Sequence, residues 1–157
     1  MKRLALGIIV ALLLSSFAAA EEKRPIKLSP KDKCPVCGMF VTKYPDWVAQ
    51  IIFRDGSYAV FDGAKDLFKY YFNLKKYNPA KRSEEIASLY VMDYYGLTLI
   101  DGFRAFYVMG SNIYGPMGRE LIPTTKEEEA KEFLRDHAGK RILKFKEITP
   151  ELVRSLD

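Results

Sequence analysis

Apolar and polar residues follow one another along the chain in two runs that share the same order of predicted elements. In the first run, residues 48–53 and 58–61 are predicted strands joined by an Asp-Gly hairpin turn. Apolar side chains then recur at helical spacing over residues 64–72, where Asp62 is positioned to cap the helix. Residues 89–95 complete the run as a third strand. The pattern therefore predicts strand, turn, strand, helix, strand.

The second run repeats this order further along the chain. Its strand, glycine-rich turn, strand, helix and strand are expected at residues 105–109, 111–118, 120–122, 126–137 and 141–145. Thr149 and Pro150 then open a short terminal helix. A unit of about 60 residues is small for an independent fold, so two such units gain stability by burying their apolar faces against each other. We therefore predict an α+β fold built from two similar ββαβ units, residues 34–95 and 96–157.

Residues 1–20 have the three parts of a secretory signal peptide. Lys2 and Arg3 precede an apolar run over residues 4–14, and a row of alanines offers a cleavage site. The apolar run is shorter than the roughly 20 residues that span a bilayer. Residues 21–33 are charged and contain prolines, which is typical of a flexible lead-in. We expect an exported, periplasmic protein that is soluble and has no membrane span once the signal peptide is removed.

The charge of the chain argues against one class of partner. The net charge is +5, and removal of Lys2 and Arg3 with the signal peptide lowers it to +3. The basic residues are spread along the sequence, with the densest group at residues 75–82 beside a predicted helix. Nucleic-acid binding calls for a concentrated basic stripe or face. We therefore expect no nucleic-acid partner.

Both cysteines of the chain lie in the stretch KCPVCGMFV, as Cys34 and Cys37. Exported proteins commonly join two cysteines in a disulfide, but this bridge would close a very short loop and constrain the unfolded chain little. The same spacing occurs in thioredoxin-like redox proteins. No predicted strand precedes Cys34, so the βα unit that carries a thioredoxin site is missing. A redox pair stays open as an alternative.

Zinc and copper(I) sites differ in the number and type of ligands that this stretch would have to supply. A structural zinc site takes four ligands, usually Cys or His, whereas the chain has two cysteines and one histidine, His137, at a predicted helix end. Asp62 could add a ligand, but without a second Cys-x-x-Cys a zinc site would be incomplete or intermolecular. Copper(I) takes fewer ligands, and thiolate and thioether sulfur select it. Cys34, Cys37 and Met39 supply three such atoms within six residues.

A second stretch, GSNIYGPMG, supplies another thioether. Its glycines predict a tight turn from which the side chain of Met117 projects. Methionine often fills gaps in a core, and we interpret Met92 and Met109, both in predicted strands, in that way. Met39 and Met117 are the candidate thioether ligands. His137 at a helix C-terminus is typical of a partner for the helix dipole rather than of a metal ligand.

The sequence shows no assembled catalytic constellation. Ser111 and Asp46 have no base or orienting partner in their sequence context, and neither a Ser-His-Asp order nor a phosphate-binding loop occurs. We therefore expect a binding protein and not an enzyme.

The stretches CPVCGM at 34–39 and FYVMGSNIYGPMGRELIP at 106–123 together resemble the NosL family, the accessory proteins of nitrous oxide reductase. The similarity continues through YPDWVAQIIFRDGSYAV at 44–60 and EFLRDHAGKRILKFKEI at 132–148. It therefore covers nearly the whole chain that follows the predicted lead-in. The pairing of Cys-Gly-Met with a later Gly-Pro-Met-Gly is specific to this resemblance.

The resemblance implies a periplasmic Cu(I) metallochaperone of two ββαβ units, in a family thought to deliver copper to the multicopper sulfide centre of nitrous oxide reductase. The Cys-Gly-Met of the family corresponds to Cys37, Gly38 and Met39. Its later methionine corresponds to Met117. Cys34 is shared by only part of the family. The client would be nitrous oxide reductase or another copper-requiring protein.

Two departures from the family pattern and two other interpretations stay open. Family members commonly carry a lipid-anchoring cysteine at the signal cleavage site, and this chain has none there. Arg119 stands where a histidine is common in similar sequences. CPVCGM also resembles the start of YHS and related heavy-metal motifs, which keeps a general heavy-metal-binding protein in view. The other interpretation is a thiol–disulfide redox protein that uses the pair Cys34 and Cys37.

Overall fold

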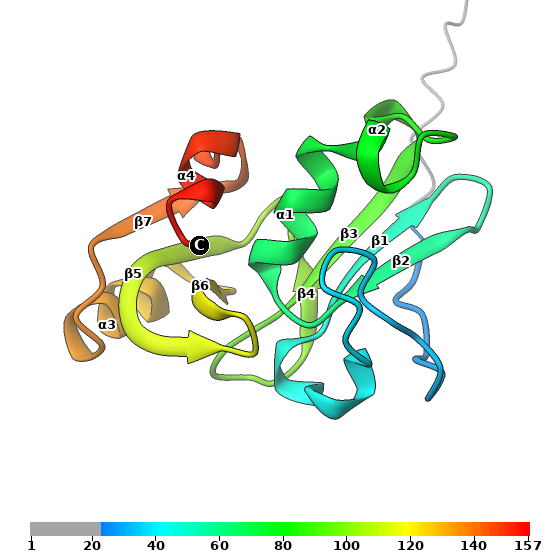
Figure 1. Cartoon of the computed structure of the whole chain (residues 1–157). Helices are drawn as coiled ribbons and strands as arrows, with labels where there is room; N and C mark the ends of the chain where they lie inside the picture. The colour runs from blue at the N-terminus through cyan, green and yellow to red at the C-terminus, as the bar shows by residue number, and fades with distance from the viewer. Residues whose placement is uncertain (1–22) are drawn as a thin grey trace, which may run out of the picture.

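Two β-sheets lie side by side with a helix between them (Figure 1). The computed structural model describes residues 23–157, so the predicted signal peptide lies outside the described residues. The strands are β1 (Ala49–Phe53), β2 (Tyr58–Phe61), β3 (Ile86–Met92), β4 (Leu99–Asp101), β5 (Phe106–Gly115), β6 (Gly118–Thr124) and β7 (Arg141–Lys144). The α-helices are α1 (Ala64–Phe72), α2 (Leu74–Tyr77), α3 (Glu127–Asp136) and α4 (Pro150–Arg154). Short 3-10 helices are η1 (Val41–Lys43), η2 (Pro45–Trp47), η3 (Ser83–Glu85) and η4 (Phe145–Glu147).

The two sheets share one topology. The first has the strand order β2-β1-β3-β4 and the second β6-β5-β7, with every pair antiparallel. In each sheet the first strand of the unit therefore lies at the centre, flanked by its hairpin partner and by the strand that follows the helix. This arrangement confirms the predicted α+β fold.

Helix α1 joins the two halves. It contacts β1 and β2 of the first sheet and β6 of the second, and α4 packs beside it. The ring of Phe68, fully buried in α1, lies 5.3 Å from that of Tyr107 in β5 and 5.4 Å from that of Phe145, centroid to centroid. These ring contacts connect the two sheets through one contiguous core. Each buried aromatic ring adds a large apolar area to it. A smaller apolar cluster lies under α3.

Several elements differ from the sequence-based expectation. Strand β4 pairs with β3, so the first sheet takes up residues of the predicted second unit, 96–157. Strand β5 continues to Gly115, and the expected turn over residues 111–118 shrinks to its last four residues. Helix α2 occupies a segment for which no helix is predicted. Strand pairing and packing decide these elements, and the propensities of single residues do not contain them.

The expected cap of α1 is wrong. Gly63 is the N-cap residue and no side chain caps the helix, while Asp62 is 1% exposed and accepts a hydrogen bond from a cysteine. A Cβ atom on Gly63 would lie 2.2 Å from the Glu120 carboxylate of β6, so the close approach of α1 to the second sheet explains the glycine. The predicted start of the terminal helix at Thr149 and Pro150 is confirmed, and Thr149 caps α4 by accepting from the Leu152 N–H at 3.3 Å.

Residues 23–33, predicted as part of a flexible lead-in, lie along the first sheet and are hydrogen-bonded to it. The backbone of Ile26 exchanges two hydrogen bonds, of 2.8 and 2.9 Å, with the buried side chain of Gln50 in β1. Ser88 and Tyr90 of β3 bond the backbone of Lys23, each at 2.7 Å. A buried amide needs partners, and the sequence gives no local sign that Gln50 faces this segment.

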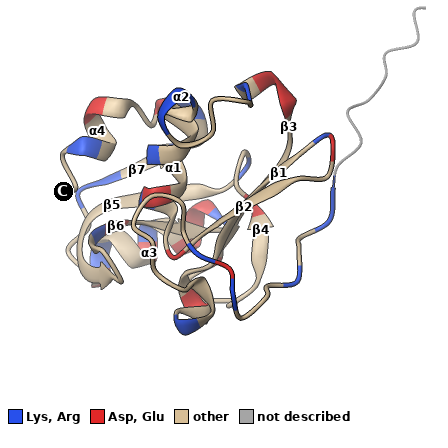
Figure 2. Ribbon diagram, turned by 45° about the vertical axis from the view of Figure 1, so that its right-hand side comes forward, with Lys and Arg blue, Asp and Glu red and all other residues tan. Residues whose placement is uncertain are grey.

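The surface carries charges of both signs. Lys and Arg lie interspersed with Asp and Glu over the sheets and helices (Figure 2).

Among residues 23–157, no helix has the length and hydropathy required to cross a bilayer. His137 ends α3 as its C-cap residue, and its ring lies 4.4 Å from that of Phe133, in keeping with the structural role expected for it.

Candidate metal centre

A tight loop holds the two cysteines. The Cys34 N–H donates to the Met39 carbonyl and the Gly38 N–H donates to the Cys34 carbonyl, both at 2.9 Å. Gly38 has φ +81°, a left-handed conformation that glycine adopts without strain. Lys33 and Phe40 form a β-bridge that closes the base of the loop. The sequence CPVCGM thus folds into a compact turn whose two thiols approach each other.

Two carboxylates face the thiols. Cys34 Sγ donates to Asp66 Oδ2 at 3.3 Å, and Cys37 Sγ donates to Asp62 Oδ1 at 3.1 Å. One donor atom from each of these four residues lies within 4.8 Å of all the others. Asp62 follows β2 and Asp66 lies in the first turn of α1, and both carboxylates reach the thiols. The cluster therefore joins the cysteine loop to the β2–α1 connection.

Both thiols are free and have raised pKa values. Desolvation is the largest cause at each sulfur: it raises the pKa of Cys37 to about 11 and that of Cys34, which is 1% exposed, further still. The negative carboxylates of Asp62 and Asp66 act in the same direction. Backbone N–H groups oppose the shift by pointing at the sulfurs, those of Cys37 and Val36 at Cys34 and that of Met39 at Cys37. The metal-free thiols are protonated at neutral pH.

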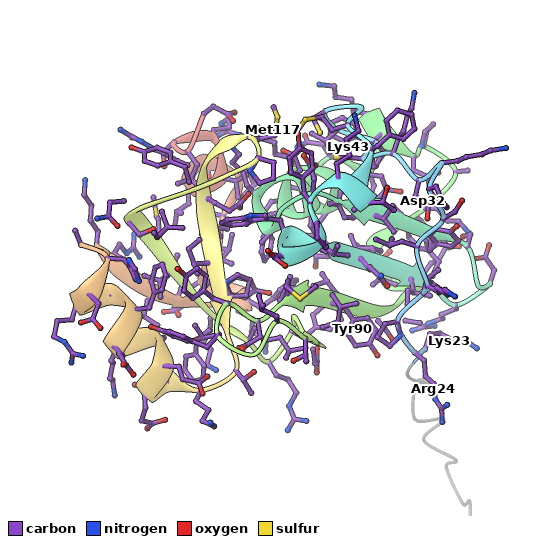
Figure 3. All side chains as sticks on the ribbon, turned by 90° about the horizontal axis from the view of Figure 1, so that it is seen from below. Lys23, Arg24, Asp32, Lys43, Tyr90 and Met117 are labelled. Carbon is purple, nitrogen blue, oxygen red and sulfur yellow. The ribbon has the colours of Figure 1, made fainter. Side chains whose placement is uncertain are left out.

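The two candidate thioethers lie on different segments. Met39 belongs to the cysteine loop, and its Sδ accepts a hydrogen bond from the Tyr44 hydroxyl at 3.5 Å. Met117 lies in the β5–β6 turn and is 42% exposed. Figure 3 shows Met117 and Lys43, which closely follows the cysteine loop, at the same edge of the molecule. Of the predicted ligands the structure thus brings Cys34 and Cys37 together, and the hydrogen bonds of these thiols go to carboxylates rather than thioethers.

A buried lysine ties the Met117 turn to the helix of the site. Lys65 lies in α1, between Asp62 and Asp66 in the sequence. Its Nζ donates to the Met117 carbonyl at 2.7 Å. Its backbone N–H donates to the buried carboxylate of Glu120 in β6 at 2.5 Å, and the Leu121 N–H donates to the same oxygen at 2.8 Å. These bonds fix the second sheet to the start of α1. They position the turn of Met117 relative to the β2–α1 connection.

Part of this arrangement is not predicted from the sequence. Asp62 is expected there only as a helix cap or an extra zinc ligand, and Asp66, Lys65 and Glu120 are not expected at the site. A usable signal was the pair of aspartates four residues apart at a predicted helix start, in DGAKD. The pairing of that segment with the cysteine loop 25 to 32 residues earlier depends on the tertiary fold.

Stability should fall as pH rises from 5 to 8 because of Glu120. Desolvation, the largest cause, raises its pKa to about 8, above the 4.5 of an ordinary glutamate. The folded chain therefore keeps a proton that the unfolded chain has lost, at up to about 1.4 kcal/mol per pH unit. Thermal melts at several pH values should show a shallower slope for Glu120→Gln than for the wild type. The exposed control Glu128→Gln should keep the wild-type slope, and equal slopes in all three would contradict the prediction.

Comparison with known proteins gives a consistent picture. The sequence model of the NosL family matches residues 25–153. The copper-binding lipoprotein NosL of Stutzerimonas stutzeri is 29% identical over 161 residues, which cover 95% of this chain and 80% of that protein. The crystal structure of the copper chaperone NosL from Shewanella denitrificans has the same fold, with a TM-score of 0.69 at 23% identity over 83% of this chain and 99% of that chain. The resemblance seen in the sequence is confirmed, and the chain belongs to the NosL family.

Proposed function

We propose that the protein binds one Cu(I) ion as cargo in the periplasm and hands it to a copper-requiring client. The observation that carries the proposal is the approach of Cys34 Sγ and Cys37 Sγ within the Cys-Gly-Met loop of a NosL-family chain. Thiolate sulfur selects Cu(I) over harder ions. A relative with 29% identity is named a copper-binding lipoprotein, which supports copper as the cargo and export as its setting.

The ligand set we propose is Cys37 with Met117, supported by Cys34 and Met39. A thioether binds Cu(I) without losing a proton, so the methionines add affinity without adding charge to a partly buried site. Met117 is exposed and Cys37 is half-buried, so a partner protein can reach both side chains. A carrier needs such access because a client must reach the ion to take it.

A thiol–disulfide redox function is the second candidate, and the raised thiol pKa values count against it. The thiolate is the attacking species in disulfide exchange, and reactive cysteines have lowered pKa values. Here burial raises the pKa of Cys37 to about 11. We therefore propose a carrier and not an enzyme.

Replacement of Met117 by leucine should weaken Cu(I) binding about tenfold, since loss of one weak ligand is worth roughly 1.4 kcal/mol. Leucine keeps the apolar volume of the side chain and removes the sulfur. Competition between reduced protein and a Cu(I) chelator measures the affinity. Met92→Leu, in β3, is the matched control and should bind as the wild type does. Equal affinity of the Met117 variant and the wild type would remove this residue from the ligand set.

The client we propose is nitrous oxide reductase. Incubation of the Cu(I)-loaded protein with copper-free reductase should move copper to the reductase and restore activity, whereas a passive heavy-metal-binding protein would keep its metal. Deletion of the gene should leave reductase protein present but poor in copper. A fully metallated reductase in the deletion strain would rule out this client and leave Cu(I) binding standing.

A further inference from the structure

The cluster of two thiols and two carboxylates contains more donors than Cu(I) uses. Asp62 and Asp66 are 1% and 2% exposed, so water does not solvate them. Among residues 23–157, Asp62 Oδ2 and Asp66 Oδ1 have no hydrogen-bond partner, and the nearest cation to Asp66 Oδ1 is Lys69 Nζ at 3.9 Å. An unpaired buried carboxylate oxygen costs folding free energy. A cation bound between the two carboxylates would offset their buried negative charge.

The distances suit a tetrahedral ion. Zinc–sulfur bonds of about 2.3 Å and zinc–oxygen bonds of about 2.1 Å put neighbouring donors in a tetrahedron about 3.4–3.8 Å apart. The two sulfur–oxygen contacts are 3.3 and 3.1 Å, and the whole set lies within 4.8 Å. Shifts of the donor atoms by about 1 Å would complete such a shell.

The backbone of the cysteine loop is already arranged for bound thiolates. N–H groups of Val36 and Cys37 point at Cys34 Sγ, and the Met39 N–H points at Cys37 Sγ. Such hydrogen bonds orient a metal-bound sulfur and offset its charge. They come from the loop itself and do not depend on Met117. A four-donor shell can therefore form without the β5–β6 turn.

Charge favours a divalent ion in this shell. Two thiolates and two carboxylates carry four negative charges, so a monovalent ion leaves three uncompensated and a divalent ion leaves two. Zn²⁺ accepts both cysteine sulfur and aspartate oxygen in tetrahedral sites, while Cu(I) favours sulfur alone. The mixed donor set thus matches a borderline divalent ion better than a soft monovalent one.

We propose that Cys34, Cys37, Asp62 and Asp66 form a tetrahedral site for a borderline divalent cation such as Zn²⁺. Binding exchanges the two thiol protons for the metal, with no change of oxidation state. The site shares its cysteines with the proposed Cu(I) set but uses the aspartates in place of the methionines. The two ions therefore exclude each other, and Zn²⁺ occupies the thiols until Cu(I) displaces it.

Anaerobic titration of the reduced protein with Co²⁺, a spectroscopic substitute for Zn²⁺, tests the site. One equivalent should give the intense visible bands of tetrahedral Co²⁺ and a sulfur-to-cobalt charge-transfer band, and one equivalent of Zn²⁺ should abolish both. X-ray absorption of the zinc-loaded wild type should show two sulfur neighbours at about 2.3 Å and two oxygens at about 2.0–2.2 Å. Weak octahedral bands, or a shell without two sulfurs, would overturn the proposal.

The aspartates are tested by Asp62→Asn and Asp66→Asn, singly and together. Loss of a partner outside the metal shell costs 10–100-fold in affinity, so loss of both direct ligands should weaken Co²⁺ binding by more than about 100-fold. Asp46→Asn, at an exposed position, is the matched control and should bind Co²⁺ as the wild type does. Circular dichroism establishes that the variants are folded. Unchanged Co²⁺ affinity in the folded double variant would refute the role of the carboxylates.

The two metal proposals fail separately. Met117→Leu should weaken Cu(I) binding and leave the Co²⁺ spectrum unchanged, whereas the aspartate variants should lose Co²⁺ binding and still bind Cu(I). A protein that binds Co²⁺ tetrahedrally but not Cu(I) would disprove the copper carrier and support the divalent site. A protein that binds Cu(I) but gives no tetrahedral Co²⁺ spectrum would disprove the divalent site alone.

Discussion

Oxidation of Cys34 and Cys37 to a disulfide should abolish Cu(I) binding while the fold is retained. The two Sγ atoms lie within 4.8 Å of each other, so side-chain rotation can bring them to bonding distance. Formation of the bond removes two electrons and two protons and leaves no thiolate for the metal. Cys34 packs into the buried core, but the bond joins two residues of one short turn and therefore requires no change in strand pairing or in α1.

The measurement compares one sample before and after stoichiometric oxidation. Thiol titration counts the free cysteines, circular dichroism follows the fold, and chelator competition gives the Cu(I) affinity. Cys34→Ser is the matched control, because it cannot form the internal disulfide and should bind Cu(I) equally before and after the same treatment. If the fully oxidised wild type held Cu(I) as tightly as the reduced form, the thiols could not be the main ligands.

The proposed export would place these thiols in an oxidising compartment. Disulfides form and persist outside the cytoplasm, so the site needs a bound metal or a reductant to stay competent there. The proposed divalent ion would provide that protection, since a metal-bound thiolate is not free to couple with its neighbour. Oxidation of the reduced protein should accordingly be slower with one equivalent of Zn²⁺ present.

The elements that were predicted well are those in which local signals agree. The turn between β1 and β2 has its Asp-Gly pair, and the apolar spacing over residues 64–72 matches α1 residue for residue. Strand β5 shows the opposite case. Its second half carries glycine, serine and asparagine, which favour a turn, yet pairing of Tyr114 with Arg119 in β6 keeps it extended. Pairing across the β5–β6 hairpin overrides the propensity of the single residues there.

The residues of the site that were predicted are those close together in the sequence. Cys34, Cys37 and Met39 stand in one short motif, so their proximity follows from the sequence alone. Asp62 and Asp66 reach the thiols only because β2 ends, and α1 begins, beside the cysteine loop. Glu120 comes from the other sheet, and its contact with Lys65 depends on the small size of Gly63. Such contacts between distant segments leave no periodic signal.

Between pH 6 and pH 8 the apparent affinity for Cu(I) should rise about 100-fold per pH unit. Burial, the main cause, raises the pKa of Cys37 to about 11 and that of Cys34 higher, so both thiols keep their protons in the metal-free protein across this range. Cu(I) must then displace two protons, and each displaced proton makes the affinity rise about tenfold per pH unit. Because the pKa values are raised, the slope should continue beyond pH 8.5, where an ordinary thiol begins to lose its proton unaided.

Chelator competition at half-unit intervals of pH, corrected for protonation of the chelator, gives the slope directly. Cys34→Ser is the matched variant, because with Cys37 as the one remaining thiol it should show a slope of only about tenfold per unit. Met117→Leu should bind more weakly at every pH and keep the wild-type slope, since a thioether carries no proton. A wild-type slope of tenfold would mean that a single thiol binds the ion. A slope that levels off below pH 8 would mean that the thiols ionise before the metal arrives, contrary to the protonated, carboxylate-bonded pair in the structure.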